Sequence, residues 1–194
     1  FMFRLLGVEA ITVVPGGSNM AAAMQEVADE LAAQGRKGYI IAGGGSNAIG
    51  GLGYVACAQE LQQQLFDQGV QIDRVVVGSG SSGTHGGLVA GFLGNHIHIP
   101  IVGVGVSRDP ADQQPLVMKE AQAVADLLGL GLTVKPEHVT CVGGFWQPKY
   151  SVPNAKMVEA VQLLARTEAI PLDPVYTGKI MAGLIGLARQ GFFK

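Results

Sequence analysis

The sequence predicts an α/β fold, in which a doubly wound and mostly parallel sheet carries helices on both faces. The first reason is that strand-like apolar runs alternate with helical patterns along nearly the whole chain. The second is the run from residue 99 to 106, which is apolar at almost every position, as in a strand buried on both faces of a parallel sheet. The third is composition: hydrophobic residues make up 48% of the 194 residues and charged residues only 14%, so most elements should be covered on more than one side.

The helices are predicted from apolar residues that recur at helical spacing and from capping residues at their ends. Ser18 or Asn19 can cap one helix, Asn154 can cap another, and Gly35 lies just past the end of the first. One helix is expected to end at residues 5–7. The other expected helices cover residues 20–33, 52–66, 88–93, 111–128, 154–167 and 177–190.

The strands are predicted from short runs of β-branched and aliphatic residues that end in glycine, proline or polar residues. Two of these runs lead directly into glycine-rich turns, at residues 43–47 and 78–87. The expected strands cover residues 10–14, 39–41, 75–77, 99–106 and 139–142.

The second glycine-rich turn is the strongest candidate for a binding site. It follows the strand at 75–77, precedes a helical pattern, and carries the hydroxyls of Ser79, Ser81, Ser82 and Thr84. Glycines let successive backbone N–H groups point inward, and the start of a helix adds partial positive charge. These features predict a phosphate cradle. The alternative is an ordinary strand-to-helix turn that needs glycine for its geometry alone.

Charge and composition exclude several classes of partner. The net charge is −2, and no cluster of Lys and Arg lies beside exposed aromatic residues, so nucleic acid is not expected as a partner. Polar residues and glycines interrupt every apolar stretch before it reaches membrane-spanning length, so no membrane partner is expected. Cys57 and Cys141 lie far apart and form no Cys-x-x-Cys pair, which favours a reducing, cytoplasmic location.

Other motifs suggest weaker alternatives. Gly78, Gly80 and Gly83 match the dinucleotide fingerprint, and Arg108 after the next expected strand could bind the extra phosphate of NADP, so an NADP-dependent oxidoreductase is an alternative. Gly178-Lys179 matches only the end of a Walker loop, because Asp173 stands where the first glycine of that motif should be. A phosphate-transferring ATPase is therefore not expected.

Three histidines are judged by their surroundings in the chain. His96 and His98 have no third metal ligand nearby, so a surface role is expected for them. His85 directly follows the cradle and is expected to pack or to donate a hydrogen bond rather than to act as a base.

Two tyrosines stand out by their positions. Tyr150 and Tyr176 both lie in proline-containing loops, where functional side chains are concentrated. Taken alone, each is equally consistent with an amphipathic core residue.

Four stretches together resemble a known family: residues 44–54, 79–85, 150–154 and 172–179. They are similar to the pyridoxal-phosphate enzymes of the tryptophan-synthase β type that include D-cysteine desulfhydrase, 1-aminocyclopropane-1-carboxylate deaminase and L-cysteate sulfo-lyase. The resemblance runs in order from about Leu5 to Phe192. It implies that residues 18–194 form the large, cofactor-phosphate-binding domain and that residues 1–17 are a remnant of a smaller domain.

The resemblance also implies roles for single residues. Ser81, Ser82, Gly83 and Thr84 match the loop that holds the phosphate of pyridoxal 5'-phosphate, in agreement with the cradle read from the residues themselves. Tyr150 and Tyr176 match two tyrosines that face the substrate. Thr177 matches a position near the ring nitrogen of the cofactor, where the deaminase carries a glutamate and the desulfhydrase a hydroxyl residue.

The implied reaction is a β-elimination from a small amino acid, giving pyruvate, hydrogen sulfide and ammonia as in D-cysteine desulfhydrase. The sister activities on L-cysteate and on the cyclopropane amino acid are alternatives, and the resemblance implies a homodimer. The lysine that anchors the cofactor covalently lies, in this family, upstream of every segment matched here. We therefore expect the chain to be a fragment and, on its own, to release no sulfide from D-cysteine above the rate of free cofactor.

Overall fold

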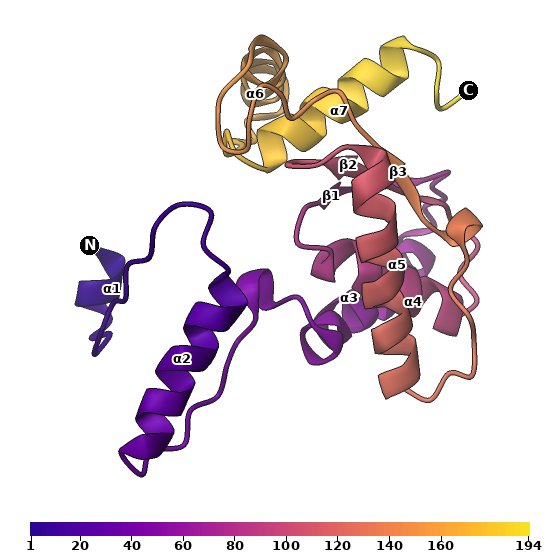
Figure 1. Ribbon diagram of the computed structural model, residues 1–194. Coiled ribbons are helices and arrows are strands. Elements are labelled where there is room, and N and C mark those ends of the chain that lie inside the picture. Colours follow the sequence, from indigo (N-terminus) through magenta and orange to yellow (C-terminus); the bar gives the residue numbers. More distant parts are fainter. The chain divides into compact units, whose positions relative to one another are not determined.

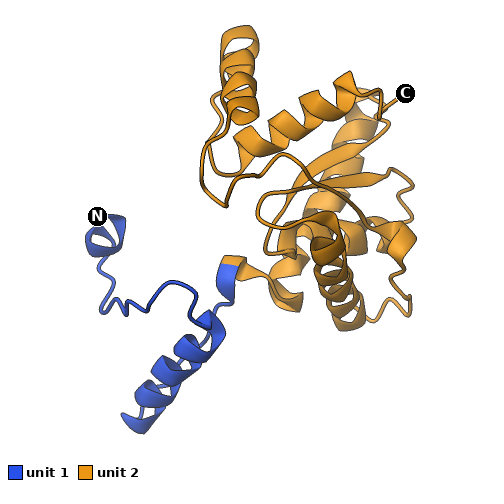
Figure 2. Ribbon diagram, turned by 45° about the horizontal axis from the view of Figure 1, so that its top comes forward, with its two compact units in different colours: residues 1–43 blue, residues 44–194 orange.

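The computed structural model describes all residues from Phe1 to Lys194, and the chain divides into two compact units. Unit 1 comprises Phe1–Gly43 and unit 2 comprises Gly44–Lys194 (Figure 2). The sequence analysis placed a boundary after Gly17, whereas packing separates the chain after Gly43. The assignment of residues 1–17 to a smaller domain remains a prediction.

Unit 1 contains α1 (Met2–Leu5) and α2 (Met20–Ala33). Of the two capping residues expected for α2, Asn19 fills the role: its Oδ1 accepts from the backbone N–H groups of Ala21 and Ala22 at 3.1 and 3.2 Å. The strands expected at residues 10–14 and 39–41 are wrong, because both stretches are irregular. A strand needs a hydrogen-bonded neighbour, and neither stretch has one.

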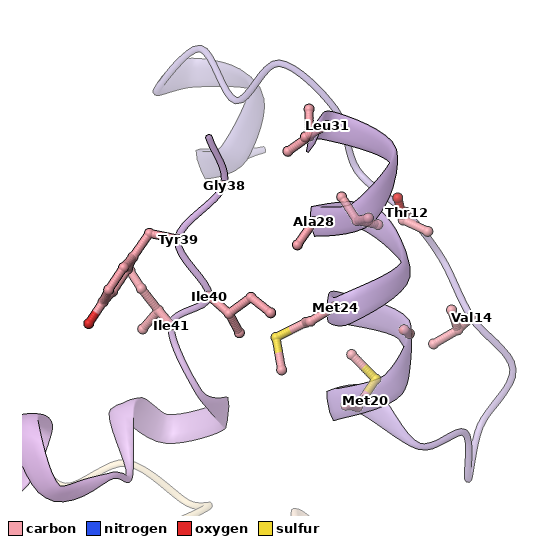
Figure 3. A pocket seen from close by; sticks show the side chains of 12 residues that line it. Thr12, Val14, Met20, Met24, Ala28, Leu31, Gly38, Tyr39, Ile40 and Ile41 are labelled. Carbon is pink, nitrogen blue, oxygen red and sulfur yellow. The ribbon is translucent and has the colours of Figure 1, made fainter. Parts of the chain in front are cut away.

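One side of α2 borders an apolar groove of about 320 Å³ within unit 1. In Figure 3, Met24 and Ile40 point toward one another across it, while the ring of Tyr39 points away from the helix. The lining carries no ionisable side chain except the phenol of Tyr39.

Unit 2 is built on a three-stranded parallel sheet of order β1-β2-β3 (Figure 1). The strands are β1 (Val75–Ser79), β2 (Ile101–Gly105) and β3 (Thr140–Val142), with Val77 opposite Gly103 and Gly103 opposite Cys141. The helices of unit 2 are α3 (Ala48–Gln68), α4 (Gly83–Gly94), α5 (Pro110–Leu127), η2 (Pro136–His138), α6 (Ala155–Glu168) and α7 (Thr177–Arg189), and η1 (Gly43–Gly45) spans the boundary between the units.

Helices cover both faces of this sheet, which confirms the predicted fold class. On one face a core that includes Val89, Ile101 and Val124 joins the sheet to α4 and α5, with α3 packed against those two helices. On the other face Val102 and Val104 pack with residues of α6 and α7. Figure 1 shows these two helices on the opposite side of the sheet from α4 and α5. The alternation along β2 explains this double burial, since successive side chains point to opposite faces. None of the helices has the length and apolar character needed to cross a lipid bilayer.

Glycines set how closely these layers approach. A Cβ on Gly183 of α7 would lie 2.7 Å from Val104, and one on Gly103 of β2 would lie 2.3 Å from the ring of His85. Real Cβ atoms do not approach other atoms so closely, so a side chain at either position would push a helix off the sheet. Close helix-on-sheet packing at β2 therefore depends on these two positions.

Candidate active site

The cradle expected from the sequence connects the end of β1 to the start of α4. Ser82 adopts φ 83°, a left-handed conformation that is uncommon for a residue with a side chain. A Cβ on the next residue, Gly83, would lie 2.7 Å from Oγ of Ser46. The turn therefore has a conformation that costs free energy and a position that only glycine fills, both typical of ligand-binding loops.

Ser46 holds this loop from outside. Its hydroxyl accepts from the backbone N–H of Gly83 at 3.0 Å and donates to Oγ of Ser81 at 2.8 Å. Sequence reasoning gave Ser46 no role, although it lies in the first glycine-rich turn. The available signal was the repeated pattern of an apolar run followed by glycines and a hydroxyl.

The start of α4 can bind an anion. The side chain of Ser82 makes no capping hydrogen bond to this helix of 12 residues, and among the first N–H groups only that of Gly83 has a side-chain partner, Ser46. The N–H groups of a first helical turn have no partner within the helix, and the helix dipole adds partial positive charge there. A phosphate group supplies the missing acceptors.

A cleft of about 320 Å³ connects the cradle to one of the two predicted tyrosines. Ser81, Ser82 and Thr84 line it together with Tyr176, and Val106 and Ile180 add apolar surface. Thr177 lies outside this lining. The structure thus brings three cradle residues and one predicted substrate-binding residue to a single cleft.

A buried polar network supports the cradle from behind. The side-chain amide of Gln113, on α5, is fully buried and donates to Oγ of Ser79, to the carbonyl of Gly80 and to Oγ of Ser82 at 3.1, 3.1 and 3.3 Å. Arg108 donates to the same Gly80 carbonyl at 2.9 Å. Sequence reasoning missed Gln113, because nothing near it in the chain marks it as a partner of the loop.

His85 belongs to the same network. Its Nδ1 lies 3.0 Å from Oγ of Ser79, and its side chain is fully buried. Burial lowers the pKa of His85 to about 4, so the ring is neutral near pH 7. The expectation that His85 is a packing and hydrogen-bonding residue is confirmed.

Burial also raises the pKa of the nearby Cys141 thiol to about 11, although a hydrogen bond with Ser79 opposes the shift, so this thiol is not a nucleophile.

Tyr150 and Tyr176 form a hydrogen-bonded pair. Their hydroxyls bond to each other, and their rings meet edge to face with centroids 5.9 Å apart. The bond with Tyr176 raises the pKa of Tyr150, with smaller contributions from burial and from the negative charge of Asp173. The hydroxyl of Tyr150 is therefore protonated at neutral pH. The fold thus brings together two residues that lie 26 positions apart in the chain.

Thr177 and Asp173 fix the start of α7. Oγ1 of Thr177 donates to Oδ2 of Asp173 at 2.5 Å and accepts from the Asp173 backbone N–H at 2.8 Å. Burial raises the pKa of Asp173, but hydrogen bonds from the Thr177 hydroxyl and from the backbone N–H groups of residues 175–177 outweigh it and lower this pKa to about 2. The Asp173 carboxylate, which sequence reasoning did not assign, thus holds the turn that carries Tyr176.

Comparisons with known proteins give the relatives of the whole chain. The family model for pyridoxal-phosphate dependent enzymes matches residues 1–194. A D-cysteine desulfhydrase from Klebsiella pneumoniae (strain 342) is 46% identical over 177 residues, which is 91% of this chain and 53% of that protein. A crystal structure described as an ACC deaminase homologue superposes with a TM-score of 0.85 at 31% identity, covering 100% of this chain and 57% of that one. The chain thus spans about half the length of the relatives that it matches.

Proposed function

This chain belongs to the family of pyridoxal-phosphate dependent enzymes, and from that premise we propose that it provides the phosphate- and substrate-binding part of a carbon–sulfur lyase. The proposed reaction is a β-elimination on a small amino acid such as D-cysteine, which yields pyruvate, hydrogen sulfide and ammonia. The observation that carries the proposal is the single cleft lined by both Tyr176 and the cradle at the start of α4.

The cradle residues fit the phosphate of pyridoxal 5'-phosphate. Gly83 leaves no room for a Cβ, Ser82 makes no capping hydrogen bond to the first turn of α4, and Ser81 and Thr84 line the same cleft. We assign Ser81, Ser82, Gly83 and Thr84 to this phosphate. When bound, the cofactor supplies an electron sink for the carbanion formed at Cα of the substrate.

The tyrosine pair is suited to orienting the substrate and to moving a proton. The raised pKa keeps Tyr150 protonated at neutral pH, and its hydroxyl shares one hydrogen bond with that of Tyr176. The pair therefore holds a further proton that can be donated to a departing sulfur atom, and either hydroxyl can bind a substrate carboxylate. These two roles are proposed for Tyr150 and Tyr176.

Thr177 is proposed to lie near the ring nitrogen of the cofactor. Because its hydroxyl hydrogen is already donated to Asp173, Thr177 can act there only as an acceptor. A hydroxyl is a weaker partner than a carboxylate, which supports β-elimination over opening of a cyclopropane ring. A lyase acting on L-cysteate and a deaminase related to the ACC deaminase homologue remain the alternatives within the family.

The NADP-dependent oxidoreductase has less support. Its proposed phosphate ligand, Arg108, donates to the carbonyl of Gly80 at 2.9 Å and lies 3.4 Å from Oε1 of Gln113, so its guanidinium is used within the loop. The family match also points to a different cofactor. We propose a cytoplasmic location, from the spacing of Cys57 and Cys141, and a homodimer, as the resemblance implies.

A comparison of three ligands tests the proposed function. The dissociation constants of the chain for pyridoxal 5'-phosphate, for pyridoxal and for NADPH are measured by isothermal titration calorimetry. Since the cradle binds phosphate, we expect pyridoxal 5'-phosphate to bind at least tenfold more tightly than pyridoxal. Equal affinities for these two ligands, or tighter binding of NADPH, would contradict the assignment.

A further inference from the structure

Lys179 is a cation buried without a counter-ion. It lies in the first turn of α7, and none of its side chain is exposed to solvent. No carboxylate lies within salt-bridge distance of its ammonium group. Burying an unpaired charge is costly, so the hydrogen bonds that the group makes must matter to the fold. Nothing in the proposed reaction uses this residue.

The ammonium group of Lys179 binds two carbonyl groups of a single loop. Its Nζ donates to the oxygen of Trp146 at 2.9 Å and to the oxygen of Lys149 at 3.1 Å. Tyr150 follows Lys149 directly, in a segment between β3 and α6 that has no helix or strand of its own. Lys179 thus fixes the residues that lead into Tyr150.

Lys179 also belongs to the element that carries the other tyrosine. Tyr176 is the residue at the N-terminal end of α7, three positions before Lys179. One side chain therefore joins the loop of Tyr150 to the helix of Tyr176. The loop has other anchors, including Trp146 Nε1 to Asp109 at 3.2 Å and Asn154 Nδ2 to the Gln147 carbonyl at 2.7 Å, but those anchors do not reach α7.

We infer that Lys179 is a positioning residue that holds the Tyr150 and Tyr176 hydroxyls within hydrogen-bond distance of each other. A compact ammonium group with three donors suits this task, because it can bind two carbonyl groups at once. The hydrogen bond itself is a property of this chain, while its consequence for the reaction rests on the proposed function. Loss of Lys179 should then lower kcat of the lyase more than it raises KM for the amino acid.

The test follows the tyrosine hydroxyls directly and needs no cofactor. The chain is labelled with ¹³Cζ-tyrosine, and the titration of each tyrosine is followed by NMR in wild type, Lys179→Met and Tyr176→Phe. We expect Tyr150 to titrate above its ordinary value in wild type and to return toward about 10 in both variants, because both lose the hydroxyl pair. Lys179→Gln keeps amide donors on a shorter side chain, so it should show an intermediate shift.

Lys156→Met is the matched control. Lys156 is also a lysine that donates to a backbone carbonyl, that of Gly144 at 3.3 Å, but it is exposed and makes no hydrogen bond to the residues next to Tyr150 or to α7. Its removal should leave the Tyr150 titration unchanged.

The inference is overturned if a folded Lys179→Met chain, or a folded Lys179→Gln chain where the first variant unfolds, titrates like wild type. It is also overturned if Lys156→Met shifts Tyr150 equally. Neither result depends on pyridoxal 5'-phosphate binding, so a failure here is distinguishable from a failure of the proposed function.

Discussion

Replacing Gly83 by alanine tests the geometry of the cradle at its tightest point. The new Cβ would lie 2.7 Å from Oγ of Ser46 and 3.2 Å from both Cα and Cβ of the same residue. Because two of these three atoms are firmly held by the chain, rotating the Ser46 hydroxyl away does not relieve the clash. Either Ser46 or the start of α4 must move, and the 3.0 Å hydrogen bond between them is lost.

The expected cost of Gly83→Ala follows from these contacts. Overpacking costs roughly 1–3 kcal/mol, and a lost hydrogen bond adds about 1 kcal/mol. Alanine recovers up to about 1 kcal/mol through its higher helix propensity. The free energy of unfolding should therefore fall by roughly 1–3 kcal/mol. A cradle moved by even a few tenths of an ångström should also bind pyridoxal 5'-phosphate about tenfold more weakly, which corresponds to about 1.4 kcal/mol.

Urea denaturation and calorimetric titration measure the two effects, and Gly53→Ala is the control. Gly53 lies in α3, and a Cβ added there would have no atom within 4 Å. Alanine at this position should therefore stabilise the chain by up to about 1 kcal/mol and leave cofactor affinity unchanged. Adding Ser46→Gly to Gly83→Ala removes the obstructing side chain and should recover part of the stability. A Gly83→Ala chain with the stability and affinity of wild type would refute this account of the cradle.

Three further predictions concern the groups around the site. Gln113→Leu removes the side-chain amide that donates to three acceptors, so it should lower the free energy of unfolding by about 2–4 kcal/mol in urea titrations. It should also weaken binding of pyridoxal 5'-phosphate. Gln114→Leu should leave that affinity unchanged, because the Gln114 amide bonds only to the carbonyls of residues 136 and 139. His85 has a pKa of about 4 in the folded chain against 6.5 unfolded, so its effect on the free energy of unfolding is constant above pH 6.5, and about 3 kcal/mol of stability is lost as the pH falls to 4. His85→Gln should flatten the dependence of stability on pH over that interval, and an unchanged slope would contradict the lowered pKa. Asp173, with a pKa of about 2 against 3.8 unfolded, stabilises the chain above pH 4 and loses this effect toward pH 2; because it is exposed, Asp173→Asn should cost no more than about 1 kcal/mol at pH 7, measured by thermal unfolding at both pH values.

The sequence predicted those parts of the fold that depend on local patterns. The helix from Met20 to Ala33 has the predicted bounds and one of the two predicted caps, because Asn19 satisfies the first N–H groups without help from other elements. The turn between β1 and α4 was predicted for the same reason, because its glycines and hydroxyls follow one another directly in the sequence between a strand and a helix.

Long-range contacts explain the parts that the sequence could not predict. The strands expected at 10–14 and 39–41 have strand-like composition, but a strand forms only beside another strand, and neither stretch has a neighbour to pair with. Gln113 and Lys179 lie 31 and 33 positions from partners that give them their roles, Ser82 and Trp146. No spacing rule along the chain signals such contacts.

The central claim is that the loop at the start of α4 binds the phosphate of the cofactor, and amide chemical shifts test it most directly. The ¹H–¹⁵N spectrum of the chain is followed during separate titrations with pyridoxal 5'-phosphate and with pyridoxal. We predict that the amides of Ser81, Ser82, Gly83 and Thr84 shift with the phosphorylated ligand and not with pyridoxal. Shifts that fall elsewhere in the chain, or loop amides that respond equally to both ligands, would contradict the claim.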